Sequence, residues 1–212
     1  ELVNNYFGKI PRPERVLIPT YTKEPTQDGE RLVTLRRVGD VQNVSVMYHT
    51  PPGPHSDYAA IAVLEQLLTS EPSGRLYTAL IESKLASSQW GFAPGLKEGG
   101  FMYLNADVRK ENDIMAAKET MLATLDDIVL SPPTMEEVDR AKGRILKNWN
   151  LGYNNSDRVG LSMSEYIAQG DWRLYFLFRD RVEAVKTEDV VRVAEKYLVP
   201  SNRTIGMFIP DD

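Results

Sequence analysis

The two histidines are the side chains best suited to bind a catalytic metal, and their spacing argues against that role. His49 and His55 lie six positions apart, on either side of residues 50–54 (TPPGP). Two ligands on one helix would lie three or four positions apart, and prolines interrupt any helix here. The next candidate ligand is Asp57. Neither HExxH nor the inverted HxxEH motif occurs, so we do not expect a three-ligand zinc site from this chain alone.

The sequence gives equally little support for a catalytic nucleophile or for an anion-binding site. The chain has no cysteine and no GxSxG motif, and a serine nucleophile would need one of the two loop histidines as its base. Ser73-Gly74-Arg75 resembles an anion-binding turn but lacks the spaced glycines of a phosphate cradle, so we expect Ser73 to cap a helix. The adjacent acids Asp126-Asp127 and Glu136-Glu137 point in different directions on a helix, which indicates solvated faces.

Aromatic side chains gather in the C-terminal third of the chain. Because these positions fall in segments of helical periodicity, we expect them to pack in a core rather than to form a ligand-stacking box. The group comprises Trp149, Tyr153, Tyr166, Trp172, Tyr175, Phe176 and Phe178.

Composition narrows the class of protein. The 212 residues carry a net charge of -5, with lysine and arginine scattered among acids, which argues against a nucleic-acid partner. No apolar run approaches the ~18–20 residues that a membrane-spanning helix needs, so we expect a soluble chain. It opens Glu-Leu-Val without an initiator methionine or signal region, and we interpret it as a piece of a longer protein.

Alternating apolar residues predict the strands. Residues 31–38 and 41–48 alternate, and Gly39-Asp40 between them predicts a hairpin. Residues 90–108 predict a second hairpin, with its turn at Gly99-Gly100, and residues 203–209 predict a last short strand.

Helical periodicity accounts for most other segments. Ser56 is the expected cap of a helix whose apolar stripe includes Ile61, Leu64, Leu67 and Leu68. A second stripe after Asp113 consists of Ile114, Ala117, Met121, Leu125 and Ile128, and Thr134 with Glu137 predicts a capping box for the next helix. Further helices are expected at about 74–84, 156–169, 172–182 and 187–198.

This order of elements predicts an α+β fold, a mostly antiparallel sheet with helices packed on one face. Prolines at positions 11, 13, 19 and 25 predict an extended linker over 6–25. We therefore divide the chain into a linker, residues 1–25, and one domain, residues 26–212.

Several segments, in this order, resemble the second, non-catalytic domain of pitrilysin-family (insulinase-like, M16) zinc peptidases. Residues 73–84 (SGRLYTALIESK) resemble its Gly-Ser-Arg-Leu helix opening, and residues 6–13 (YFGKIPRP) resemble the join between the first two domains. Residues 156–180 (SDRVGLSMSEYIAQGDWRLYFLFRD) and 202–210 (NRTIGMFIP) resemble large bacterial members. The positions picked out as structural or interdomain residues are Ser73, Gly74, Arg75, Asp171, Trp172, Arg173, Arg179 and Asp180.

The resemblance implies a parent of four similar domains that close like a clamshell around a peptide, with the HxxEH zinc site in the first domain. The last domain of such a parent supplies an arginine and, seven residues later, a tyrosine. Ile81 and Ser88 stand at those positions here, so no catalytic residue and no metal ligand is carried over. Zinc would belong to the parent enzyme.

The expected function is thus a structural, substrate-enclosing domain of a zinc metalloendopeptidase. Its expected partners are the other domains of the parent and a peptide substrate. The alternative is a non-enzymatic scaffold or binding domain that has lost peptidase activity. The resemblance implies a periplasmic or extracytoplasmic location, with a cytoplasmic one left open.

Overall fold

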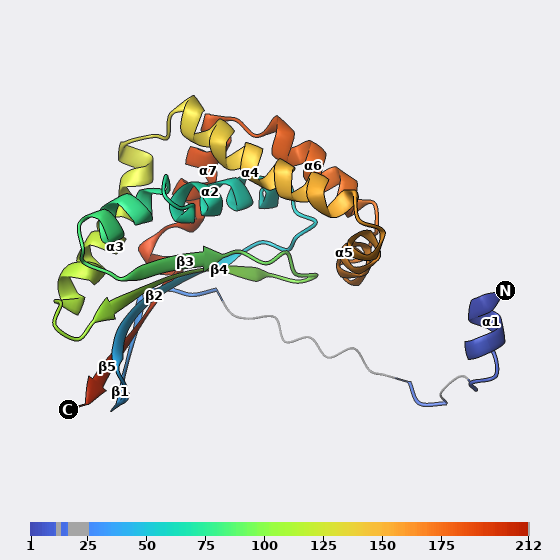
Figure 1. Cartoon of the computed structure of the whole chain (residues 1–212), viewed down its shortest axis with the longest axis horizontal. Coiled ribbons are helices and arrows are strands. Elements are labelled where there is room, and N and C mark those ends of the chain that lie inside the picture. Colours follow the sequence, from blue (N-terminus) through green and yellow to red (C-terminus); the bar gives the residue numbers. More distant parts are fainter. Residues whose placement is uncertain (12–13, 17–25, 212) are drawn as a thin grey trace.

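The computed structural model describes residues 1–11, 14–16 and 26–211. Five strands form one sheet, and the helices that follow residue 57 lie on one of its faces (Figure 1), as the α+β prediction requires. Residues 12–13 and 17–25 of the expected linker lie outside the described residues. Tyr6 and Phe7, the first residues of the stretch expected to be extended, end a short exposed helix, α1 (Leu2–Phe7), so that expectation is wrong for them. The first proline is Pro11, too far along the chain to prevent that turn of helix.

The sheet has the order β1-β5-β2-β4-β3, which contradicts the first predicted hairpin. β1 (Arg31–Val38) pairs in parallel with β5 (Arg203–Asp211), and β5 pairs antiparallel with β2 (Val41–Thr50). The C-terminal strand therefore lies between two strands that are neighbours in sequence. At the reversal between them, a Cβ on Gly39 would lie 2.8 Å from the Phe208 ring of β5, so glycine lets the chain pass around the inserted strand.

The second predicted hairpin is confirmed. β3 (Ser88–Phe92) pairs antiparallel with β4 (Gly100–Arg109), and β4 continues the sheet to β2. Because β3 pairs only with β4 among the described strands, it is one edge of the sheet.

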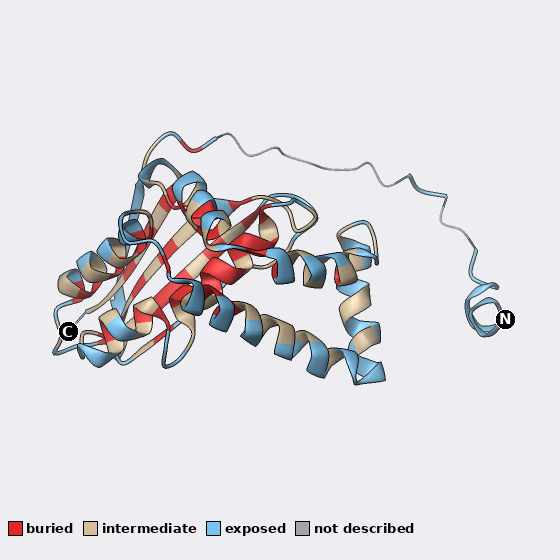
Figure 2. Cartoon of the chain, turned by 90° about the horizontal axis from the view of Figure 1, so that it is seen from above, coloured by how far each residue is buried: buried red, intermediate tan, exposed pale blue. Residues whose placement is uncertain are grey.

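The core lies between the sheet and the helices α2 (Tyr58–Thr69), α3 (Ile114–Leu130) and α7 (Thr187–Tyr197). In β2, buried residues alternate with partly exposed ones, so one face of the strand points into the core. Figure 2 shows the buried residues in red on the strands and on the helices that cover them. The predicted stripe of α3 is confirmed, since its five members are all buried: Ile114, Ala117, Met121, Leu125 and Ile128.

Two helix starts differ in how they are capped. The capping box of α4 (Met135–Tyr153) is confirmed: Thr134 Oγ1 accepts from the Glu137 N–H at 3.2 Å, and Glu137 Oε2 accepts from the Thr134 N–H at 2.8 Å. The expected Ser56 cap of α2 is wrong, because the N-cap is Asp57 and its side chain makes no capping bond. That carboxylate is held instead by α7, as described below.

The remaining helices form an arm beside the sheet. α4 runs out past the core, α5 (Ser156–Ala168) crosses its far end, and α6 (Leu174–Ala184) returns (Figure 2). α6 begins two residues later than predicted. The segment predicted at 74–84 contains a π-helix, η1 (Tyr77–Glu82), and a short 3-10 helix, η2 (Pro200–Asn202), precedes β5.

Candidate functional site

In the described part of the chain, no group of three histidine, aspartate or glutamate side chains is placed to hold a metal ion. His49 lies in β2. His55 Nδ1 accepts a hydrogen bond of 3.0 Å from the Asp57 N–H, so it supports the start of α2. The two histidines thus serve a strand and a turn, and the structure does not combine them with further ligands.

One motif-like segment was missed from the sequence. Residues 62–66 (AVLEQ) of α2 have the frame of HxxEH, with alanine and glutamine where the two histidines would stand. A search for histidine pairs passes over it, whereas a search for the lone glutamate in that frame would find Glu65. Ala62 has no ligand atom, so the residues present do not fit a zinc ion of this type.

Glu65 is nevertheless a buried acid. Thr69 Oγ1 donates to its Oε1 at 2.7 Å, and Gln66 Nε2 donates to its Oε2 at 2.9 Å. Burial raises the pKa of the Glu65 carboxyl above its ordinary value, and these two bonds oppose that shift.

The predicted turn Ser73-Gly74-Arg75 joins two helical segments. Arg75 Nε and one terminal nitrogen donate to the two carboxylate oxygens of Glu137 at 2.9 and 3.2 Å, and the other terminal nitrogen donates to the Ser131 carbonyl at 2.8 Å. Arg75 lowers the pKa of Glu137 to about 2. A Cβ on Gly74 would lie 2.6 Å from two backbone carbonyl oxygens, which explains the glycine.

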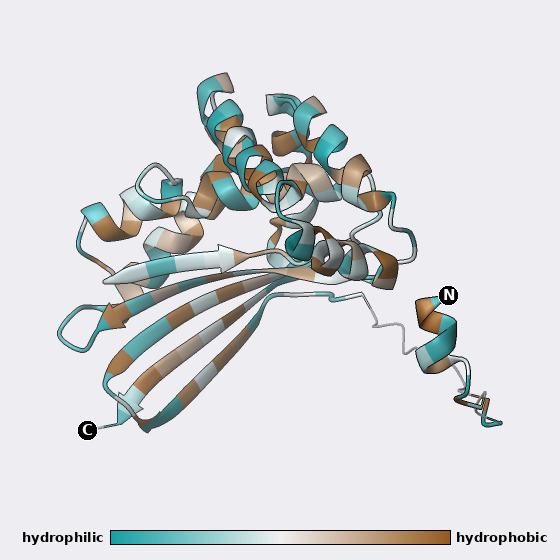
Figure 3. Ribbon diagram, turned by 45° about the vertical axis from the view of Figure 1, so that its right-hand side comes forward, coloured by the Kyte–Doolittle hydropathy of each residue, from teal (hydrophilic) through white to brown (hydrophobic). Residues whose placement is uncertain are grey.

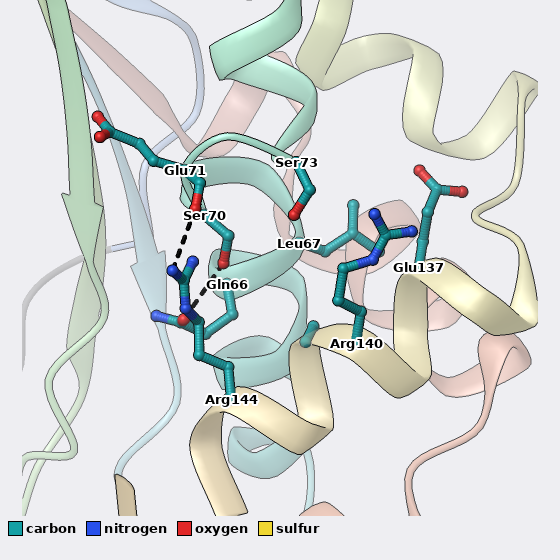
Figure 4. Close-up of a pocket in the computed structure, with 9 residues that line it drawn as sticks. Gln66, Leu67, Ser70, Glu71, Ser73, Glu137, Arg140 and Arg144 are labelled. Carbon is teal, nitrogen blue, oxygen red and sulfur yellow. Dashed lines mark hydrogen bonds between the residues drawn. The ribbon is translucent and has the colours of Figure 1, made fainter. Parts of the chain in front are cut away.

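Ser73 does not cap η1, contrary to expectation, because the N-cap position of η1 is Leu76 and no side-chain hydrogen bond caps it. The serine instead lines a hollow of about 230 Å³ between α2 and α4 (Figure 4). Arg140 and Arg144 extend from α4 toward this hollow in Figure 4. Arg144 donates to the Glu71 carbonyl at 3.1 Å, and Arg140 lies 3.5 Å from Glu136.

The other predicted residues lie on the arm and form local ion pairs. Arg173 pairs with Asp171, whose Oδ1 also accepts from the Arg173 N–H at 2.9 Å, just before α6 begins. Arg179 pairs with Asp180. Trp172 is 50% exposed, so the expected packing of this side chain in a core is wrong. Exposed pairs of this kind contribute little stability, and an interdomain role for them stays a prediction.

Aromatic residues of the arm stack around Trp149. Its ring lies 4.9 Å from those of Tyr153 and Tyr175, and the Arg179 guanidinium lies 4.9 Å from its centroid. Tyr175 is buried, but it is not part of the main core. The predicted aromatic group is therefore mostly a separate cluster that stiffens the arm, with Phe178 packed against the main core.

A buried charge cluster fixes α7 to the start of α2. Asp57, 5% exposed, accepts from Arg192 at 2.7 Å, Lys196 at 2.9 Å and the Tyr197 hydroxyl at 2.8 Å. Burial opposes ionisation, but the three donors together hold the pKa of Asp57 well below its ordinary value.

The sheet face opposite the helices carries a second aromatic group, here called the edge patch: Trp90, Phe92, Phe101 and Tyr103. Ring centroids within it are 5.3–5.9 Å apart. Trp90 is 46% and Phe92 is 42% exposed. In Figure 3 no helix lies beneath these strands, so large apolar side chains face outward on an uncovered sheet.

The family model of the peptidase M16 inactive domain matches residues 1–145. The chain belongs to this family. The inactive domain is also 42% identical to the inactive peptidase domain of a candidate zinc protease from Bordetella parapertussis, over 85% of this chain and 98% of that one, with a TM-score of 0.78. A candidate zinc protease from Bordetella pertussis is 40% identical over 81% of this chain and 94% of that one, with a TM-score of 0.75.

A curated relative of the inactive domain is the zinc protease PqqE of Helicobacter pylori. It is 26% identical over 99% of this chain, which spans 48% of the length of PqqE. The chain is thus about half as long as this curated relative. Membership of this family makes the chain a domain of the inactive, non-catalytic type. Among the described residues, no helix combines the length and apolar character needed to cross a membrane.

Proposed function

We propose that this inactive domain forms a wall of a zinc metalloendopeptidase, where it braces the zinc-bearing domain and helps to enclose a peptide. Zinc and the activation of water would come from an HxxEH domain of the same parent. A periplasmic or extracytoplasmic site of action is part of the proposal, on the strength of the family resemblance.

The uncovered sheet face with the edge patch carries this proposal. Interfaces between domains of one chain bury about 600–1,500 Å² and are partly polar. The face has the same partly polar character, since a polar network adjoins the patch: Asn43 Nδ2 donates to Asn105 and Asp107 at 2.8 Å each. Aromatic side chains such as Trp90 and Phe92 are typical of interface cores.

The test is to mix the inactive domain with the HxxEH domain of its parent and to measure binding by calorimetry. We expect saturable association at micromolar concentrations, and about tenfold weaker binding after Trp90→Ser with Phe92→Ser. The control is Leu130→Ser, which removes an exposed apolar side chain at the end of α3, away from the edge patch.

Enclosure is tested separately, by peptide cleavage. We expect chelator-sensitive cleavage by the mixture and none by the inactive domain alone. Binding without any cleavage would favour the scaffold alternative, and no binding at high micromolar concentration would contradict the bracing role.

A further inference from the structure

The strand β1 forms the edge of the sheet opposite to β3, and among the described strands it pairs only with β5. All eight of its residues are exposed, whereas every other strand of the sheet carries at least one buried residue. In Figure 1 no described helix lies beyond β1 at this edge. The strand therefore extends the sheet without adding a side chain to the core.

The backbone of β1 is a regular template for a further strand. An edge strand presents unpaired N–H and C=O groups, and proteins usually guard such an edge with a short strand, a proline, a bulge or a covering element. β1 has eight residues and no proline. Its register with β5 runs without interruption from Arg31↔Thr204 to Val38↔Asp211, so it has no bulge. None of these four devices protects it within the described part of the chain.

Apolar side chains lie on both faces of this edge. Leu32 is 60% and Val38 is 91% exposed on one face, and Val33 is 59% and Leu35 is 47% exposed on the other. Cross-strand contacts between such side chains stabilise a sheet. A strand that adds to β1 would therefore gain apolar neighbours above and below the sheet as well as backbone hydrogen bonds.

The same strand concentrates positive charge. It carries three arginines, although the chain as a whole has a net charge of -5. No guanidinium group of the three forms a hydrogen bond or an ion pair with the described residues. The three are Arg31, Arg36 and Arg37.

The acids around β1 do not neutralise these arginines. Glu30, just before the strand, pairs with Arg203 of β5. Asp40 and Asp211 lie only at the far end of the strand, beside Val38. The exposed edge thus combines free backbone groups, apolar side chains and unpaired positive charge.

We propose that β1 accepts an extended, acidic peptide segment as a further strand of the sheet. The backbone supplies the pairing, and the arginines select acidic side chains on the incoming strand. A second copy of this chain fits poorly, because pairing of two β1 strands brings the arginines of both copies together without an acid between them.

This site is separate from the edge patch, which lies on β3 and β4 near the opposite edge of the sheet. It therefore does not rest on the proposed bracing of a zinc-bearing domain. A peptide that fails to bind β1 leaves that role untouched, and failure of the two domains to associate leaves the β1 site untouched.

The probe is an octapeptide that alternates glutamate and valine, acetylated and amidated at its ends, added to the 212-residue chain. We expect saturable slowing of amide hydrogen exchange in residues 31–38 and no slowing in residues 88–92 of the opposite edge. Added salt should weaken binding, because exposed charge pairs are screened. An octapeptide of lysine and valine should not bind, and neither should the acidic peptide with prolines in place of two valines, which breaks the strand pairing.

Charge variants test the selection. Arg31→Gln combined with Arg36→Gln and Arg37→Gln should weaken binding about tenfold. Arg36→Glu alone should weaken it about threefold, which keeps the test informative if thermal melts show that the triple variant unfolds. The matched control removes the same charge from exposed positions of α4 and α5 and should leave binding unchanged: Arg140→Gln, Lys147→Gln and Arg158→Gln.

Three results would overturn the proposal. The first is unchanged exchange in residues 31–38 at millimolar concentrations of the acidic octapeptide. The second is equal binding of the acidic and basic octapeptides, or equal binding by the folded triple variant. The third is a dimer of the peptide-free chain in sedimentation velocity that already protects residues 31–38, which would assign this edge to a second copy.

Discussion

Arg75 and Glu137 join the turn before η1 to the first turn of α4 through two hydrogen bonds, 2.9 and 3.2 Å long. The same Glu137 carboxylate closes the capping box of α4 with Thr134. Glu137 therefore fixes both the start of α4 and the distance between α4 and Arg75, which lies 62 positions earlier in the chain.

Replacing this acid should destabilise the domain. We expect Glu137→Gln to lower the free energy of unfolding by ~1–2 kcal/mol at pH 7, because the partly buried ion pair with Arg75 is lost, while a glutamine can still accept the capping bond from the Thr134 N–H. Urea unfolding measures this. Glu136→Gln is the matched control, since that neighbour is exposed and lies 3.5 Å from Arg140. An equal effect of both variants would contradict the special role of Glu137.

The same pair predicts a pH dependence. The folded-state pKa of Glu137 is lowered to about 2 from an ordinary 4.5, so its contribution is present above pH 4.5 and is lost as the pH falls toward 2. The stability gap between the natural chain and Glu137→Gln should therefore shrink across that window. A gap that stays constant from pH 5 to pH 2.5 would show that the pair does not lower the pKa.

Asp57 should matter more than its place at a helix start suggests. Asp57→Asn removes the charge that Arg192 and Lys196 share, and we expect a loss of ~1–3 kcal/mol, moderated because both partners are about half exposed. Because its folded pKa lies well below 3.8, this contribution should persist in mild acid and fade only as the pH falls through that lower value. Thermal melts at pH 7 and pH 4 test both points, with Glu195→Gln, an exposed acid of α7, as the control.

The two tryptophans of the arm should differ in their effect on stability. Trp149 lies at the centre of the stack and its Nε1 donates to the Tyr175 carbonyl at 3.2 Å, so Trp149→Ala should cost ~2–4 kcal/mol. Trp172 contacts Phe176 edge-on from a half-exposed position, and Trp172→Ala should cost less than ~1.5 kcal/mol. Chemical denaturation of both variants decides this, and the reverse order would mean that the arm is not held by the Trp149 stack.

Zinc binding should depend on the two histidines of the HxxEH frame, at positions 62 and 66, which this chain lacks. We expect no stoichiometric zinc in the purified chain by elemental analysis. Ala62→His combined with Gln66→His would place two imidazoles four positions apart on α2, beside Glu65, and we expect it to bind zinc at least tenfold more tightly than Gln66→His alone. Equal zinc affinity of the double variant and the unchanged chain would show that α2 cannot present this frame to a metal.

Local patterns were enough for much of the fold. The α3 stripe, the capping box at Thr134 and the hairpin of β3 and β4 depend on residues a few positions apart, so the sequence predicts them directly. The lack of a histidine metal site is equally a matter of residue type and spacing. The family resemblance, carried by segments such as 73–84, is also visible without coordinates.

The order of the strands in the sheet depends on pairing between segments that lie far apart in the chain. The Gly39-Asp40 turn alone predicts a hairpin, yet β5 enters between β1 and β2 from the other end of the chain, because Ile205 and Met207 complete the core there. The hydrogen bond from the Gln89 side chain to the Thr69 carbonyl likewise depends on α2 packing over β3. The sequence by itself predicted most of the helices and strands after residue 26 and shows that the chain has no HxxEH motif. Only the tertiary structure decided which strands pair and which buried polar groups meet, because the free energy of burial depends on contacts between residues far apart in the chain.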